Sequence, residues 1–208
     1  MSWRLFVSYE HELVAATGKL KVASAAVCGG GMRDVDGVVN LSVPNNFSWC
    51  DLEQLARTRL KKAHLPRDCA VMFTAAKVEN AVLSQMGDVA CAITAGLSNA
   101  ASIGKTLPFE GGGTINIMLL IDAVLDDACL IGAVQSAAEA KCAAVLDMGV
   151  PVEGGKATGT TTDCITVAAT MRGDTHTYAG SGTSLGYCIG RLVRRGVRRA
   201  VVLQDGEA

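Results

Sequence analysis

Five segments rich in glycine and small polar residues each lie beside an apolar run, and they constrain this chain more than any other feature. Their sequences are TAGLSNA (residues 94–100), GTINI (113–117), AEAK (138–141), ATGTTTD (157–163) and YAGSGTSLG (178–186). Small residues beside strand-like runs let the backbone approach a ligand closely and surround it with N–H and hydroxyl groups. The pattern therefore predicts a cradle for a polar ligand.

The bulk composition limits the class of protein. The chain has 208 residues, of which 50% are apolar and only 4% aromatic, so its core must be built from aliphatic side chains. The length predicts a single domain spanning residues 1–208. A net charge of −1 gives no indication of a nucleic-acid partner. The first ten residues lack the pattern of a signal peptide and no apolar run reaches about 20 residues, so we expect a cytoplasmic protein with no membrane partner.

The cysteines and histidines argue against a metal or disulfide framework. The eight cysteines show no CxxC spacing and most lie inside apolar runs, which is typical of reduced, buried thiols. The three histidines are scattered along the chain, so we expect no metal site and no cofactor of the protein's own. A mean hydropathy of +0.30 makes a homo-oligomer an option, because buried interfaces add apolar surface.

Apolar runs and turn signals alternate along the chain. They predict strands at residues 2–8, 12–16, 20–28, 35–43, 69–74, 89–95, 114–121 and 164–171, with a turn at Thr17-Gly18. They predict a helix capped by Asp51 that runs to about residue 63, a helix at residues 77–86, a helix at residues 127–148 opened by Asp126, and a last helix capped by Ser184. On the helix at 127–148 the expected buried face is Ile131, Val134, Ala138, Cys142 and Val145. Interleaved strands and helices indicate an α+β or α/β domain with a mixed sheet and helices packed on it.

Glu139 and Lys141 are unusual because the helix around them consists almost entirely of Ala, Val, Cys and Leu. Two residues apart on a helix, they point about 200° away from each other and cannot pair locally. An unpaired buried charge is costly, so each needs another partner if it is buried. Either at least one projects into the cradle, or one is solvated and the other extends its alkyl chain to solvent.

Asp163 ends the run Thr158 to Thr162 and directly precedes an apolar strand. A carboxylate ringed by hydroxyl groups is well placed as a general base or a substrate acceptor. The alternative is structural: the threonines, Thr160 and Thr162 among them, satisfy loop backbone groups while Asp163 fixes a turn. Asn99, in a loop, and Asn116, inside an apolar strand, also interrupt the apolar pattern, and such interruptions often mark sites.

Other candidates are less distinct. Asp122, at the end of a strand, could orient a loop, bind substrate or cap. The glycines around Ser181, Thr183 and Ser184 lead into a helix N-terminus that favours an anion, although simple capping explains them equally well. The arginines of the last helix are expected to form a solvated face, with a weak anionic contact as the alternative; they are Arg191, Arg194, Arg195, Arg198 and Arg199.

Residues 102–106, SIGKT, invite comparison with a phosphate-binding loop. The GxxxxGK[ST] pattern requires glycine at position 99, where this chain has Asn99, and Pro108 blocks a following helix. We therefore expect a turn-rich loop that covers a ligand.

The five opening segments, in this order and spacing, resemble the adenosylcobinamide amidohydrolase family, and residues 29–31 (GGG) and 40–44 (NLSVP) are also similar to it. The likeness extends from about residue 20 to about residue 195. Where the family more often has Thr before the Glu of AEAK, this chain has Ala138. The resemblance implies a hydrolase that cleaves the amide between a corrin-ring propionate and aminopropanol, releasing adenosylcobyric acid in corrinoid salvage, with the cobalt-containing corrinoid as its substrate.

Residue chemistry then suggests roles. Asp163 or Glu139 could activate water, while Lys141, Asn99 or backbone N–H groups could stabilise the oxyanion. A variant forms an acyl-enzyme through Thr114, Thr162 or Ser181. The candidate substrate-binding residues are Asn99, Asn116, Thr114, Asp122, Thr160, Thr162, Ser181 and Thr183. The alternative function is a corrinoid-binding protein without hydrolytic activity.

Overall fold

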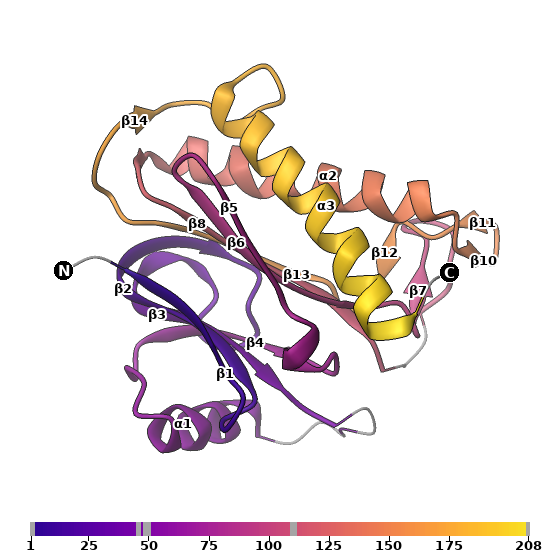
Figure 1. Ribbon diagram of the computed structural model, residues 1–208, viewed down its shortest axis with the longest axis horizontal. Helices are drawn as coiled ribbons and strands as arrows, with labels where there is room; N and C mark the ends of the chain where they lie inside the picture. The colour runs from indigo at the N-terminus through magenta and orange to yellow at the C-terminus, as the bar shows by residue number, and fades with distance from the viewer. Residues whose placement is uncertain (1–2, 45–46, 48–50, 109–111, 207–208) are drawn as a thin grey trace.

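The computed structural model describes residues 3–44, 47, 51–108 and 112–206. Three α-helices and a mixed sheet dominate it (Figure 1). The helices are α1 (Leu52–Lys62), α2 (Asp127–Met148) and α3 (Ser184–Asp205), and one 3-10 turn spans Val78–Asn80. The strands are β1 (Arg4–Ser8), β2 (Leu13–Ser24), β3 (Gly31–Ser42), β4 (Cys69–Thr74), β5 (Val82–Met86), β6 (Val89–Gly96), β7 (Ala100–Ala101), β8 (Thr114–Ile121), β9 (Val124–Leu125), β10 (Pro151–Val152), β11 (Gly155–Lys156), β12 (Gly159–Thr160), β13 (Cys164–Ala169) and β14 (Thr175–His176).

The main sheet runs in the order β4-β3-β2-β13-β8-β6-β5, with β1 paired to the first part of β2. The β13–β8 and β3–β4 pairs are parallel and the other pairs of this sheet are antiparallel, which confirms the expected mixed sheet. Because β13 and β8 are parallel, both begin at the same edge of the sheet. The end of β6 lies there too, since Gly96 is opposite Thr114.

The sheet folds over itself, so that its two halves share an inner core. Met118 of β8, Val38 of β3 and Met72 of β4 belong to one buried cluster. The alternate residues of β8, such as Ile117, point the other way and pack against α2 and α3. The helix α1 covers the outside of the other half. Figure 1 shows the resulting layers: α1 lies below β1–β4, and α2 and α3 lie above the remaining long strands.

Local sequence explains the helix ends. Asp51 accepts a hydrogen bond from the backbone N–H of Gln54 (3.0 Å), and Asp126 accepts one from that of Cys129 (2.7 Å), so both expected caps are confirmed. Gly149, with a φ of 72°, ends α2 in the left-handed conformation that glycine adopts at low cost. The cap of α3 is Thr183, whose hydroxyl accepts from the N–H of Gly186 (2.9 Å), rather than the predicted Ser184.

Two predictions of local structure, a turn and a helix, are wrong. The expected turn at Thr17-Gly18 is a β-bulge inside one strand, β2, where the register with β3 shifts between Thr17 and Leu20. The expected helix at residues 77–86 is a short 3-10 turn followed by β5, which pairs with β6 along its whole length. Pairing with a buried neighbouring strand overrides the local helical pattern.

The expected buried face of α2 is rotated from the observed one. Ile131 is 56% exposed and Ala138 is also exposed. Val145 is buried as expected and Val134 packs partly buried against the core. The other buried residues of α2 lie outside the expected face; they are Cys129, Leu130, Ala133, Ala137, Ala140 and Ala144. An almost uniformly apolar helix carries little information about which face is buried.

Seven cysteines lie in the described part of the chain and all are free thiols, as expected; Cys50 lies outside it. The stretch Asp127–Met148 is long and apolar enough to cross a membrane by length and composition alone. The core helix of a globular protein meets the same test, and α2 packs one side on the sheet.

Candidate active site

An ion pair between Lys141 of α2 and Asp163, the residue before β13, lies at the edge of the sheet where β8 and β13 begin. Both side chains are largely shielded, with 15% and 13% of their areas exposed. An ion pair in such surroundings is screened little by water, so its field acts on whatever lies next to it. The apolar surroundings of Lys141 on α2 predicted that its charge would need a partner, and Asp163 is that partner.

Asp163 accepts hydrogen bonds on both oxygens. The N–H of Ile115 donates to Oδ1 (3.1 Å), and the hydroxyl of Thr160 also donates to Oδ1. The N–H of Thr160 lies 3.1 Å from Oδ2, the oxygen that also pairs with Lys141. A carboxylate has about four acceptor positions, so these donors hold Asp163 in one orientation.

Glycine at position 159 makes this arrangement possible. A Cβ atom placed on Gly159 would clash with both Oδ2 of Asp163 and Nζ of Lys141. Gly113 plays a similar part: its φ is 142°, and a Cβ there would meet Ser98 and Asn99. The glycines of these segments therefore allow close backbone approach, although to the protein's own polar groups.

The threonines and asparagines of the same segments gather around the pair. The hydroxyl of Thr162 donates to the carbonyl oxygen of Gly113 (2.8 Å), and that of Thr114 lies 2.8 Å from the carbonyl oxygen of Thr162. The amide of Asn99 donates to the hydroxyl of Thr161 (2.7 Å). Four of the five opening segments thus meet in space, and we call Lys141, Asp163, Thr160, Thr162, Thr114 and Asn99 the edge cluster.

A buried chain of polar side chains runs from the edge cluster into the inner core. Asn116 donates to the Oδ1 of Asn40 (2.8 Å) and to the carbonyl oxygen of Phe73 (2.8 Å). Asn40 in turn donates to the hydroxyl of Thr94 (2.9 Å), which lies 3.3 Å from that of Thr74. Asn40, Thr74 and Thr94 were not singled out by the sequence reasoning, although Asn40 and Thr94 lie in segments that carry the family resemblance.

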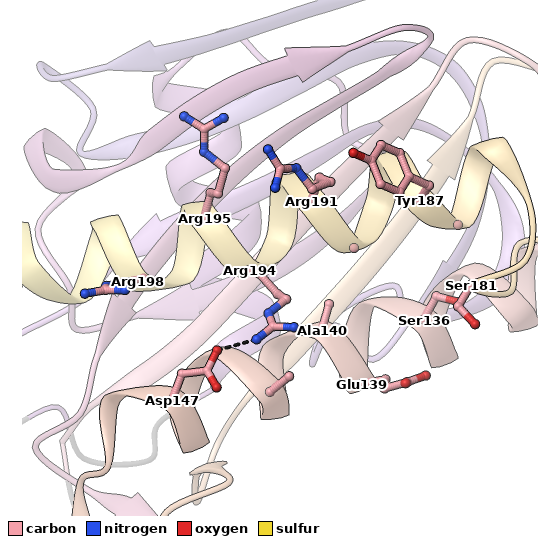
Figure 2. Close-up of a pocket in the computed structure, with 13 residues that line it drawn as sticks. Ser136, Glu139, Ala140, Asp147, Ser181, Tyr187, Arg191, Arg194, Arg195 and Arg198 are labelled. Atoms are coloured by element: carbon pink, nitrogen blue, oxygen red, sulfur yellow. Dashed lines mark hydrogen bonds and ion pairs between the residues drawn. The ribbon is translucent and has the colours of Figure 1, made fainter.

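The structure does not bring the remaining candidates to the edge cluster. Glu139 is exposed on another side of α2 and lines a groove against α3, together with Ser181 (Figure 2). Thr183 caps α3, and Asp122 accepts from the hydroxyl of Thr170 (2.6 Å) at the opposite end of β8. The fifth segment, residues 178–186, is therefore separate from the other four.

The loop after β7 brings apolar surface to the edge cluster. Ala100 and Ala101 pair with Thr160 and Gly159, and the N–H of Ile103 donates to the Thr158 hydroxyl (3.0 Å). On this anchored loop the Ile103 and Leu107 side chains are 88% and 74% exposed. Exposed apolar patches rimmed by polar residues mark ligand-binding grooves, so this loop is a candidate contact for the apolar part of a ligand.

Two further expectations bear on the site. Residues 102–106 form turns, with the N–H of Thr106 donating to the carbonyl oxygen of Ser102 (3.0 Å), and no helix follows directly among the described residues. This geometry excludes a phosphate-binding loop there. Within the described ranges no three His, Cys, Asp or Glu side chains gather into a set that could hold a metal ion.

Comparison with known proteins places the chain in a family. A family model described as adenosylcobinamide amidohydrolase matches residues 5–208. An adenosylcobinamide amidohydrolase of Halobacterium salinarum is 36% identical over 187 residues, covering 85% of this chain and 78% of the relative. One of Methanosarcina mazei is 29% identical over 196 residues, covering 90% and 92%, and an uncharacterized protein of Methanocaldococcus jannaschii is 29% identical over 209 residues, covering 84% and 80%. The chain belongs to the adenosylcobinamide amidohydrolase family, whose name describes hydrolases of an amide bond.

Proposed function

We propose that this protein hydrolyses the amide that joins a corrin-ring propionate of adenosylcobinamide to its aminopropanol arm, and that it does so at the edge cluster. Water adds across the C–N bond, giving adenosylcobyric acid and aminopropanol for corrinoid salvage. The observation that carries the proposal is the shielded Lys141–Asp163 pair, ringed by segments that also carry the family resemblance.

Lys141 has the chemistry to act on the reacting amide. Its ammonium group has three donors, one of which is used by Asp163. The others can stabilise the oxyanion that forms on the carbonyl oxygen or give a proton to the leaving amine. The family function and the charge of Lys141 together support this role.

Asp163 is better suited to positioning than to accepting a proton from water. Both its oxygens already accept from Lys141, Thr160 or Ile115, so a proton arriving there would displace existing hydrogen bonds. We therefore assign Asp163 to holding the ammonium group of Lys141 in place. Glu139 does not share this role, because it lies on another side of α2 and lines the groove against α3.

The nucleophile is either water or a hydroxyl of the edge cluster. Among the hydroxyls suggested by the sequence, Ser181 lies elsewhere and Thr114 is buried, whereas Thr162 is exposed and adjacent to Asp163. In a hydroxyl route, the oxygen of Thr162 forms an ester with the propionate carbon while aminopropanol leaves with a proton, and water then cleaves the ester. The exposed Ile103 and Leu107 would contact the apolar part of the corrin.

The test is incubation of the purified protein with adenosylcobinamide, with aminopropanol measured by mass spectrometry. We expect release by the wild type, and loss of release in Lys141→Met with corrinoid binding retained. If the intact mass of acid-quenched wild-type protein shows an ester adduct, the Thr162 route is supported. If Thr162→Val retains full turnover and shows no adduct, direct attack by water is supported. Corrinoid binding without any release by the wild type would contradict the proposal and favour a binding protein.

The setting of this activity is part of the proposal. We propose a cytoplasmic enzyme that uses a small corrinoid as its partner and has no metal of its own, the cobalt belonging to the substrate. A homo-oligomer, suggested by the mean hydropathy, remains a prediction that sedimentation velocity would test.

A further inference from the structure

A groove of about 470 Å³ separates α2 from α3 on the outer surface of the molecule (Figure 2). It is distinct from the edge cluster, because Glu139 lines it whereas Lys141, two residues on, turns toward Asp163. Its volume lies in the range of pockets that hold small molecules. Its walls carry small residues where the helices approach; they are Ala140, Ala143, Gly186 and Gly190.

The groove has an excess of positive charge. Four arginines of α3 line it, namely Arg191, Arg194, Arg195 and Arg198, against the two carboxylates Glu139 and Asp147 of α2. Arg194 is paired with Asp147. As far as the structure describes the chain, no ion pair is found for the other three. No acidic residue lies between Ser184 and Gln204 to offset them, although the whole protein has a net charge of −1.

The positions of these side chains define an elongated site with an aromatic end. Tyr187, Arg191 and Arg195 are four residues apart and project from successive turns of α3 on the side away from α2, where they line the outer rim of the groove (Figure 2). From Tyr187 to Arg198 the helix rises about 16 Å. The Tyr187 side chain is 55% exposed, so its ring is available for stacking.

We propose that this groove binds a small phosphorylated ligand that carries a planar aromatic ring, the chemistry of a nucleoside polyphosphate. The guanidinium groups of Arg191, Arg195 and Arg198 bind phosphate oxygens through paired N–H donors. The ring of the ligand stacks on Tyr187. Glu139 lies at the end of the groove with Ser136 and Ser181, away from the three free arginines (Figure 2).

The experiment is calorimetric titration of the wild-type protein with ATP, adenosine and inorganic pyrophosphate, each alone. We expect ATP to bind more tightly than pyrophosphate, and adenosine more weakly than ATP. Arg191→Gln and Arg195→Gln should each weaken ATP binding about 10-fold or more, because each removes a charge-assisted contact. Tyr187→Ala should weaken ATP binding and leave pyrophosphate binding unchanged.

The matched control is Arg199→Gln, which removes the same charge from an exposed position of α3 that does not line the groove. Equal losses in Arg199→Gln and Arg191→Gln would overturn the proposal in favour of diffuse attraction. Absence of ATP binding by the wild type would overturn it as well, as would binding of an oligonucleotide or polyglutamate but not of ATP. Amide hydrolysis is measured separately, so failure of either proposal leaves the other intact.

Discussion

At Gly159 the backbone passes so close to the Lys141–Asp163 pair that only a hydrogen atom fits on its Cα. We predict that Gly159→Ala displaces the ion pair and lowers turnover of adenosylcobinamide about 10-fold or more, because small misplacements at a reacting centre are costly. The measurement is the rate of aminopropanol release at saturating substrate.

Gly182→Ala is the control for this substitution, because no heavy atom lies within 4 Å of the added Cβ and its φ is not in the left-handed region. It should leave turnover within about two-fold of the wild type, as surface substitutions usually do. Full activity in Gly159→Ala would show that the pair does not have to be held where the structure places it.

Buried thiols give the protein a stability that depends on pH. Burial raises the pKa of Cys69 and of Cys164 from 9.0 to about 12, and for Cys164 the Asp163 carboxylate adds to the effect. Above pH 9 the unfolded chain loses these protons while the folded chain keeps them. The free energy of unfolding should therefore fall between pH 9 and 12, by up to about 1.4 kcal/mol per pH unit for each thiol.

Urea unfolding at several pH values measures this fall. In Cys164→Ala the slope between pH 9 and 11 should be shallower than in the wild type, since one of the thiols whose pKa is raised by burial is gone. Identical slopes in the two proteins would contradict the assignment of the pH dependence to Cys164.

At the scale of elements, the buried polar chain ties the two halves of the sheet together. Asn116 of β8 donates to Asn40 of β3 and to the carbonyl oxygen of Phe73 in β4, across the inner core. The hydrogen bond to Asn40 is buried and the one to Phe73 is partly buried, so water cannot readily replace Asn116 as the donor to Asn40. This explains why an amide interrupts the apolar run of β8.

We predict that Asn116→Leu lowers the free energy of unfolding by about 1–3 kcal/mol for each acceptor left without a donor. Chemical denaturation monitored by circular dichroism measures the change. Met118→Leu is the matched control, since it lies two residues along β8 on the same face, and it should cost less than about 1.5 kcal/mol. If the two substitutions lowered the free energy of unfolding equally, the amide hydrogen bonds of Asn116 would not be a specific source of stability.

The elements that could be predicted from sequence are those with strong local signals. The strands at residues 69–74 and 114–121 and the helix with its cap at Asp126 match the structure because apolar runs, caps and glycine stops define them. The strand β5 could not be predicted, since its hydrogen bonds come from β6 rather than from its own sequence. The buried face of α2 could not be predicted because apolar residues surround that helix on nearly every side.

At the scale of the whole molecule, folding decides which candidate residues share a site. The parallel start of β8 and β13 brings Thr114 next to Asp163, and the pairing of β7 with β12 adds the loop after Asn99. These are long-range contacts that spacing along one chain does not encode. The sequence therefore identified Lys141, Asp163 and Asn116 as unusual, but it could not separate them from Glu139, Ser181 and Asp122.

We propose that amide hydrolysis takes place at the edge cluster and not in the α2–α3 groove. Lys141 and Glu139 are two residues apart on α2 and face these two places, so substituting each in turn separates them. Both variants are compared with the wild type under conditions where circular dichroism shows all three folded, and kcat/KM for adenosylcobinamide is measured. We predict that Lys141→Met lowers kcat/KM by about 100-fold or more, whereas Glu139→Gln changes it by no more than about two-fold. The reverse result, with Glu139→Gln inactive and Lys141→Met active, would contradict it.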